Sequence, residues 1–304
     1  METKTEHASL RPRSGSVRQS RQKSGVLSWT ARDIERRLLF PGGRYTKVSS
    51  VLTGILGLVS TLLFYGVLQL SSLEQTKLRE VFVERGPTQY LTTFLFFWCL
   101  AILTLKVMKL RLQRRALQLR VVPKDVGFVL SPANAAELLQ HVHELVDDPR
   151  HFLVLNRLVI AISNLRNLGR VGDVDDILRS QAIQDEAGIE TSYAILQGFV
   201  WAIPVLGFIG TVLGLSDAIG QFGGVLGATD DVSQISSSLK DVTAGLATAF
   251  DTTLVALAAA LIVQLAITVV RKDEEEFLDA AMEFGIKNIV ARLRLTDEGM
   301  GSEQ

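Results

Sequence analysis

One acidic residue, Asp251, lies inside an apolar run of the chain, GLATAFDTTLVALAAALIVQL at residues 245–265. Placing a carboxylate at the centre of a bilayer costs about 2.5 kcal/mol or more, so such a residue in a membrane span is expected to have a function. Thr248 and Thr252 flank it within one helical turn and supply hydroxyl groups. A carboxylate and hydroxyls in this pattern favour a polar interior that ions can pass or a partner helix can occupy.

The face of the helix that carries Asp251 begins earlier, because Thr243, Ala247 and Asp251 are spaced four residues apart. Three roles for Asp251 fit this pattern. It faces a pore and takes part in ion passage, it bonds hydroxyls or backbone groups at a subunit interface, or it sits near a water-filled end of the span and contributes little.

The preceding apolar run, WAIPVLGFIGTVLGLSDAIG at residues 201–220, is suited to close helix packing. Pro204 removes a backbone donor and can kink a helix, and Thr211 places a hydroxyl in the middle of the run. Small residues allow two helix backbones to approach closely. Those expected to do so are Gly207, Gly210 and Gly214 in this run and Gly245 in the next.

Four apolar runs of membrane-spanning length position these residues. They cover residues 48–70, 90–110, 196–219 and 242–270, and about 20 residues suffice to cross the hydrocarbon layer. Lys106, near the end of the second run, is expected to snorkel to the interface. The sequence therefore predicts an all-α polytopic membrane protein with four transmembrane helices.

The basic residues predict the topology, because lysine and arginine favour the cytoplasmic side. Residues 1–47 read as a basic, disordered cytoplasmic tail, in which 29–40 forms either an amphipathic helix on the membrane or part of a solvated tail. Residues 111–195 are expected to form a helical cytoplasmic domain between spans two and three. Residues 271–304 read as a cytoplasmic helix and tail, with RKDEEE at 271–276 as a solvated face.

The composition argues against an enzyme. The chain has no Walker loop, no nucleophile paired with a base and no metal-ligand spacing, and His141 and His143 would point to different faces of a helix. Lysine plus arginine and aspartate plus glutamate both number 32, so the overall charge gives no reason to expect a nucleic-acid partner. We expect no catalytic residues, no bound metal and no cofactor.

Together, WAIPVLGFIGTVLG and SSLKDVTAGLATAFDTTLVAL resemble the MotA/TolQ/ExbB proton-channel family over residues 148–281. The four-span layout with a cytoplasmic insertion is similar to the MotA-like branch, whereas TolQ and ExbB have three spans. By motif position, Thr211, Thr243 and Pro204 match the family's third-span threonine, its TAGL threonine and its kinking proline. In the three-span relatives a proline stands roughly where this chain has Asp251.

The resemblance implies a homopentamer in the bacterial inner membrane, with both termini cytoplasmic and a pore lined by the last two spans. Two copies of a single-span partner of the MotB, ExbD or TolR type, with an intramembrane aspartate, would occupy that pore. Such a stator couples a flow of protons or sodium ions to the mechanical work of a motor. The residues leave two alternatives open: a self-contained ion-coupled transporter that uses Asp251, and a non-conducting scaffold that holds a partner or anionic lipids.

Overall fold

The computed structural model describes residues 27–33, 35, 43–70, 77–83, 86–122, 129–165, 171–226 and 232–294. In this part of the chain the regular structure is helical, with isolated bridges and no strand. The helices are α1 (Trp29–Arg32), α3 (Ser50–Leu68), α4 (Lys77–Val83), α5 (Pro87–Ala116), α6 (Ala135–Leu145), α7 (Leu153–Ser163), α8 (Val171–Thr191), α9 (Ala194–Leu226) and α10 (Val232–Asn288). Residues 1–26, the first part of the expected N-terminal tail, lie outside the described residues.

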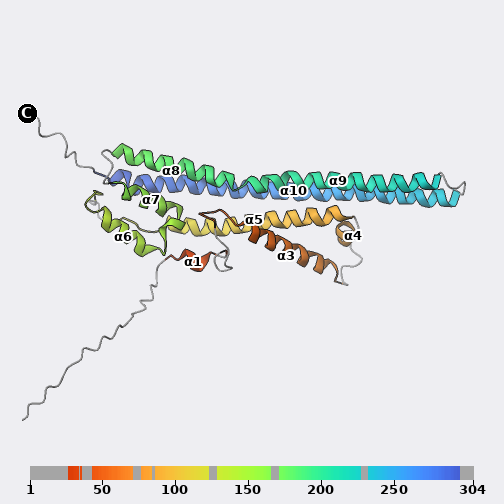
Figure 1. Ribbon diagram of the computed structural model, residues 1–304, viewed down its shortest axis with the longest axis horizontal. Coiled ribbons are helices and arrows are strands. Elements are labelled where there is room, and N and C mark those ends of the chain that lie inside the picture. The colour runs from red at the N-terminus through yellow and green to blue at the C-terminus, as the bar shows by residue number, and fades with distance from the viewer. Residues whose placement is uncertain are drawn as a thin grey trace, which may run out of the picture.

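Four helical stretches are long and apolar enough to cross a membrane. They are Ser50–Leu68, Pro87–Ala116, Val171–Gly224 and Ser233–Arg292. Figure 1 shows α10 along the length of the molecule, with α9 beside one part of it and α8 beside the other. The helices α5 and α3 lie next to the α9–α10 pair, and α6 and α7 lie at the end that holds α8. The prediction of an all-α polytopic membrane protein is confirmed.

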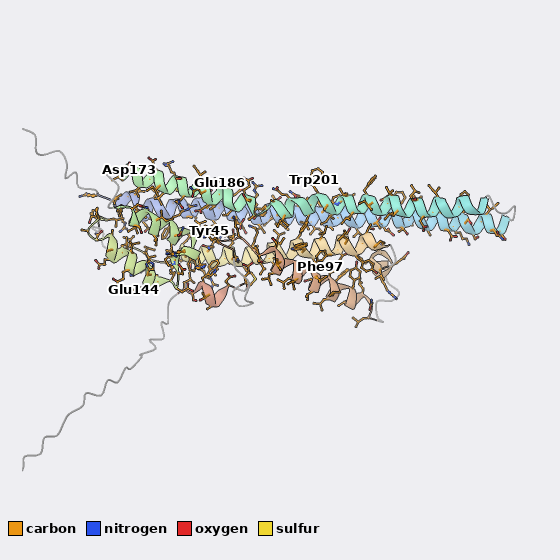
Figure 2. All side chains as sticks on the ribbon, viewed as in Figure 1. Tyr45, Phe97, Glu144, Asp173, Glu186 and Trp201 are labelled. Carbon is orange, nitrogen blue, oxygen red and sulfur yellow. The ribbon has the colours of Figure 1, made fainter. Side chains whose placement is uncertain are left out.

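The charged and apolar residues divide along the molecule. The labelled Glu144, Asp173 and Glu186 lie at the end formed by α6 to α8, whereas Phe97 and Trp201 lie along the other part (Figure 2). We call the first part, made of α1, α6, α7, α8 and the adjoining end of α10, the α6–α8 end. It holds most of the main core cluster, which includes Trp29, Phe152 and other buried residues of these elements.

The last helix is longer than its sequence pattern indicates. The apolar run at 242–270 and the charged segment that follows form one helix of 57 residues, α10. The segment after residue 270 contains no proline and is rich in good helix formers, so the helix continues through it. The helices α9 and α10 form an antiparallel hairpin, and on the α9 side only Ser192 and Tyr193 separate α9 from α8. The hairpin therefore connects the membrane-length helices directly to the α6–α8 end.

The short helix α1 packs on the segment between α6 and α7, so a helix on the membrane and a solvated tail are both wrong for its described residues. Trp29 is buried, and its ring meets Phe152 edge-on at 5.4 Å. Although burial alone raises the pKa of Asp147, hydrogen bonds from the Trp29 and Thr30 amides and from the Thr30 and Ser28 hydroxyls outweigh it, so the pKa falls to about 2. Residues 38–40 lie outside the described residues.

A buried ion pair joins α5 to α10, and it corrects two further expectations. Lys106 does not snorkel but is fully buried, with its Nζ 3.0 Å from both carboxylate oxygens of Glu274. Glu274 is fully buried as well, so 271–276 is not a wholly solvated face. The Tyr193 hydroxyl donates to the same carboxylate at 2.6 Å, and the Lys106 ammonium lies 4.1 Å from the centre of the Tyr193 ring.

Candidate ion pathway

The antiparallel helices α9 and α10 meet along a line of small side chains. A Cβ atom added at Gly207 would lie 2.5 Å from the Cβ of Ala256, and one added at Gly245 would lie 2.5 Å from the Cβ of Ala218. Gly214 faces the Gly245 carbonyl, with 3.3 Å between that oxygen and an added Cβ. At Gly207 and Gly245 the two helices are so close that an added Cβ would overlap the facing side chain, and at Gly214 the contact is tight.

Gly210 lies where three helices converge. An added Cβ would be 2.8 Å from the Thr88 hydroxyl oxygen on α5 and 2.9 Å from the Thr252 hydroxyl oxygen on α10. Thr252 is fully buried, and its hydroxyl donates to the Ala249 carbonyl of its own helix at 2.9 Å. In this chain Thr252 therefore packs between helices and does not face an open pathway. Pro204 lies inside α9, and the helix continues through it.

Two hydroxyls form a bridge between α9 and α10. The hydroxyl of Thr211 is hydrogen-bonded to that of Thr253, and it also lies 3.2 Å from the carbonyl oxygens of Gly207 and Ala249. The Thr253 hydroxyl in turn lies 3.2 Å from the Gly207 carbonyl oxygen. Each hydroxyl can donate to one of these acceptors while it accepts from the other, so this polar bridge can exchange its hydrogen-bond directions.

Asp251 lies at the level of this bridge. It falls between Ala249 and Thr253 along α10, and both of these residues contribute oxygens to the bonding of Thr211. The side chain of Asp251 is half-buried, in keeping with a position at the edge of the helix interface. The hairpin therefore carries a carboxylate and a pair of interhelical hydroxyls within about one turn of each other.

The other two predicted threonines are placed differently. Thr243 is exposed in the single chain, and its hydroxyl donates to the Leu239 carbonyl at 2.8 Å. Thr248 is half-buried and donates to the Ala244 carbonyl at 3.0 Å. The structure thus brings Thr211 and Asp251 to one level, keeps Thr252 in a packing contact, and leaves Thr243 on an open face.

Thr253 is a site residue that the sequence analysis did not include. Its signal was present in the spacing of small residues along α10, because Ala249, Thr253, Ala256 and Ala260 recur every three or four residues on one side. Such a stripe marks the side of the helix that packs on a neighbour. A hydroxyl on the stripe is therefore a candidate to bond across the interface. Among the described residues, no group of histidine, cysteine and acidic side chains is arranged to hold a metal ion.

These features define a polytopic helical membrane protein whose last two long helices form a tightly packed hairpin with internal hydroxyls. Residues 156–283 match the MotA/TolQ/ExbB proton channel family, and this match supports membership of the chain in that family. The matched segment begins in α7 and includes α8, α9 and most of α10, so it contains the whole candidate pathway. No curated protein and no solved structure matches the chain significantly.

Proposed function

We propose that this protein is the pore-forming subunit of an ion-driven stator, which couples proton or sodium flow to mechanical work. The observation that carries the proposal is the Thr211–Thr253 bridge at the level of Asp251, inside the hairpin that the family match covers. Hydroxyls can hydrate or partly coordinate an ion beside a carboxylate, and intramembrane acids mark ion paths. The energy comes from the gradient, about 2.3 kcal/mol per charge and 100 mV.

The open faces of the hairpin support assembly with further chains. Trp201 and Phe208 on α9 are 78% and 66% exposed, and Phe250 and Leu254 on α10 are 65% and 67% exposed. Lipid can cover such a surface, as can neighbouring subunits. Thr243, exposed on the same hairpin, would then line a pore enclosed by several copies. We take the homopentamer and two copies of a single-span partner with an intramembrane aspartate from the family resemblance.

The proposed setting is the bacterial inner membrane, with both termini in the cytoplasm. The basic residues on either side of the first two spans support this orientation, as does the cluster of acidic residues around 217–241 in the segment that links the last two spans. The α6–α8 end is then the cytoplasmic domain, and the link between α9 and α10 faces the other side.

Ion flux into liposomes tests the proposal directly. The chain would be co-reconstituted with its single-span partner, and flux would be measured under an imposed potential for the wild type, Asp251→Asn and Thr243→Val. We expect both variants to assemble normally and to conduct less, with Thr243→Val keeping part of the flux. Full flux in Asp251→Asn would remove the carboxylate from the pathway. Loss of the assembled complex in that variant would make Asp251 an interface residue.

A further inference from the structure

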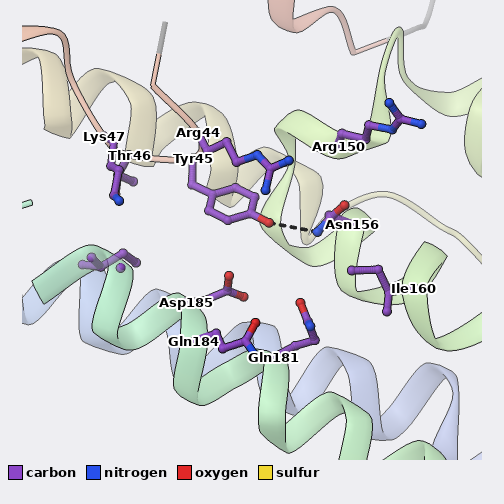
Figure 3. A pocket seen from close by; sticks show the side chains of 12 residues that line it. Arg44, Tyr45, Thr46, Lys47, Arg150, Asn156, Ile160, Gln181, Gln184 and Asp185 are labelled. Carbon is purple, nitrogen blue, oxygen red and sulfur yellow. Dashed lines mark hydrogen bonds between the residues drawn. The ribbon is translucent and has the colours of Figure 1, made fainter. Parts of the chain in front are cut away.

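A polar cavity lies between the loop that precedes α3 and the helices α7 and α8. Its volume is about 520 Å³. The residues that line it come from the 44–47 loop, from α7 and the short turn before it, and from α8 (Figure 3). The Asn156 amide donates to the Tyr45 hydroxyl at 2.9 Å on one side of it. The cavity is separate from the ion pathway, which lies farther along the hairpin.

The lining of this cavity is positively charged. Arg44, Lys47 and Arg150 contribute three cations, and Asp185 is the one acidic residue among the described residues that line it. The charge of Asp185 is already compensated, because Arg157 Nε donates to its Oδ2 at 2.7 Å. The three lining cations are therefore available to an anion.

Buried side-chain hydrogen-bond donors without a partner among the described residues lie in the wall of this cavity and next to it. Thr46 lines the cavity and is fully buried, yet its hydroxyl has no hydrogen-bond partner among the described residues. Arg157, which follows the lining residue Asn156, is also buried, and its Nη1 and Nη2 have no partner in the same part of the chain. Buried polar groups are nearly always satisfied, so unpaired donors beside a cationic cavity indicate a missing acceptor.

The loop that supplies two of the cations is held in place. Lys109 of α5 donates to the Lys47 carbonyl at 2.7 Å, and Glu35 accepts from the Ser49 amide at 2.7 Å. Tyr45 has a φ of 56°, which is the one positive φ of a non-glycine residue among those described. A loop with a fixed backbone limits the positions that its two charged side chains can reach, which lowers the entropic cost of binding an anion.

The position of the cavity points to the membrane surface. Lys47 stands three residues before α3, the first membrane-length helix, and it also lines a second cavity of about 210 Å³. The second cavity lies beside α3, α5 and the junction of α8 with α9, and it is lined in part by the apolar Val48, Ile102 and Ile195. A charged headgroup in the first cavity and apolar groups toward the second fit a single phospholipid.

We propose that the cavity between the 44–47 loop, α7 and α8 binds a phosphate group, held by Arg44, Lys47 and Arg150 with the Thr46 hydroxyl. Phosphate oxygens are strong acceptors, and arginine binds them through paired, charge-assisted hydrogen bonds. The group belongs either to the headgroup of an anionic phospholipid, which the second cavity favours, or to a free phosphate compound. Such a site would fix the packing of the first span against the α6–α8 end.

The test uses the full-length protein in nanodiscs and in detergent. Retention of phosphatidylglycerol is compared with that of phosphatidylcholine by native mass spectrometry, and binding of inorganic phosphate is measured by calorimetry. The variant Arg44→Gln/Arg150→Gln is compared with Arg115→Gln, an exposed arginine of α5 that does not line the cavity. Circular dichroism checks that the variants fold. Because each lost charge-assisted contact weakens binding severalfold, we expect the double variant to bind the phosphate group with an affinity about tenfold lower, or lower than that.

Each outcome decides the inference. Preferred retention of phosphatidylglycerol that the double variant loses and Arg115→Gln keeps would support a lipid headgroup. Binding of inorganic phosphate with the same dependence, but no lipid preference, would support a free phosphate compound. Loss of binding equally in Arg115→Gln, or no binding of either probe by the wild type, would overturn the proposal. A second pair adds a check, since Thr46→Ser should keep binding better than Thr46→Val.

Discussion

Breaking the buried pair of Lys106 and Glu274 from one side should strongly destabilise the chain. The Lys106 Nζ lies 3.0 Å from both carboxylate oxygens, and both side chains are fully buried. Lys106→Met therefore leaves a buried carboxylate that, among the described residues, keeps the side-chain hydrogen bond from Tyr193. Breaking a buried pair from one side costs about 3 to 5 kcal/mol. We expect a loss of that size in the free energy of unfolding, measured by titration with dodecyl sulfate in mixed micelles.

Two controls separate the buried charge from simple loss of contact. The double variant Lys106→Met/Glu274→Gln leaves no buried charge and still offers an acceptor to Tyr193, so it should regain about 2 kcal/mol or more of the loss. Arg114 and Asp273 join the same two helices across 3.6 Å, but their side chains are 43% and 46% exposed. Arg114→Met should therefore cost less than about 1 kcal/mol. A small loss in Lys106→Met, or an equal loss in Arg114→Met, would refute the reasoning.

Three further predictions address the hairpin and the docked N-terminal segment. Gly207→Ala should destabilise the fold by about 1 to 3 kcal/mol in the same titration, because its Cβ would overlap α10. Gly198→Ala on α9 meets nothing within 4 Å and should not destabilise, because alanine favours a helix more than glycine does. Thr211→Val should lower ion flux in liposomes while costing about 1.5 kcal/mol of stability or less, because Thr253 keeps its bond to α9; unchanged flux would remove the bridge from the pathway. The pKa of Asp147 is about 2 in the folded chain, below its unfolded value of 3.8, so this carboxylate stabilises the docked segment fully above pH 3.8 and loses that effect as the pH falls through about 2. Limited proteolysis at acid pH can follow the release of the segment, and protection that stays constant down to pH 2 would contradict the prediction.

Local patterns predicted the membrane-length helices well. Apolar runs of about 20 residues are a property of the sequence itself, and α3 (Ser50–Leu68) lies inside the run predicted at 48–70. The packing role of the glycines could also be predicted, because small residues at a spacing of four mark a close helix contact. The continuity of α10 beyond residue 270 was missed, since a change from apolar to charged residues alters the helix's environment and not its backbone.

Contacts between distant residues could not be predicted from local patterns. A lysine at the end of an apolar run has the same local sequence whether it snorkels or pairs, and the partner of Lys106 lies 168 residues away. Thr253 was missed for a similar reason, because its bond to Thr211 depends on the register of α9 against α10. The burial of Trp29 against Phe152 likewise joins segments that no short pattern connects.

The most direct test of the central claim is the native mass of the detergent-solubilised complex, expressed together with the proposed single-span partner. The stator account predicts five copies of this chain with two copies of the partner, and Asp251 and Thr243 would then belong to a shared pore. A monomer or dimer of this chain that binds no partner would contradict the account.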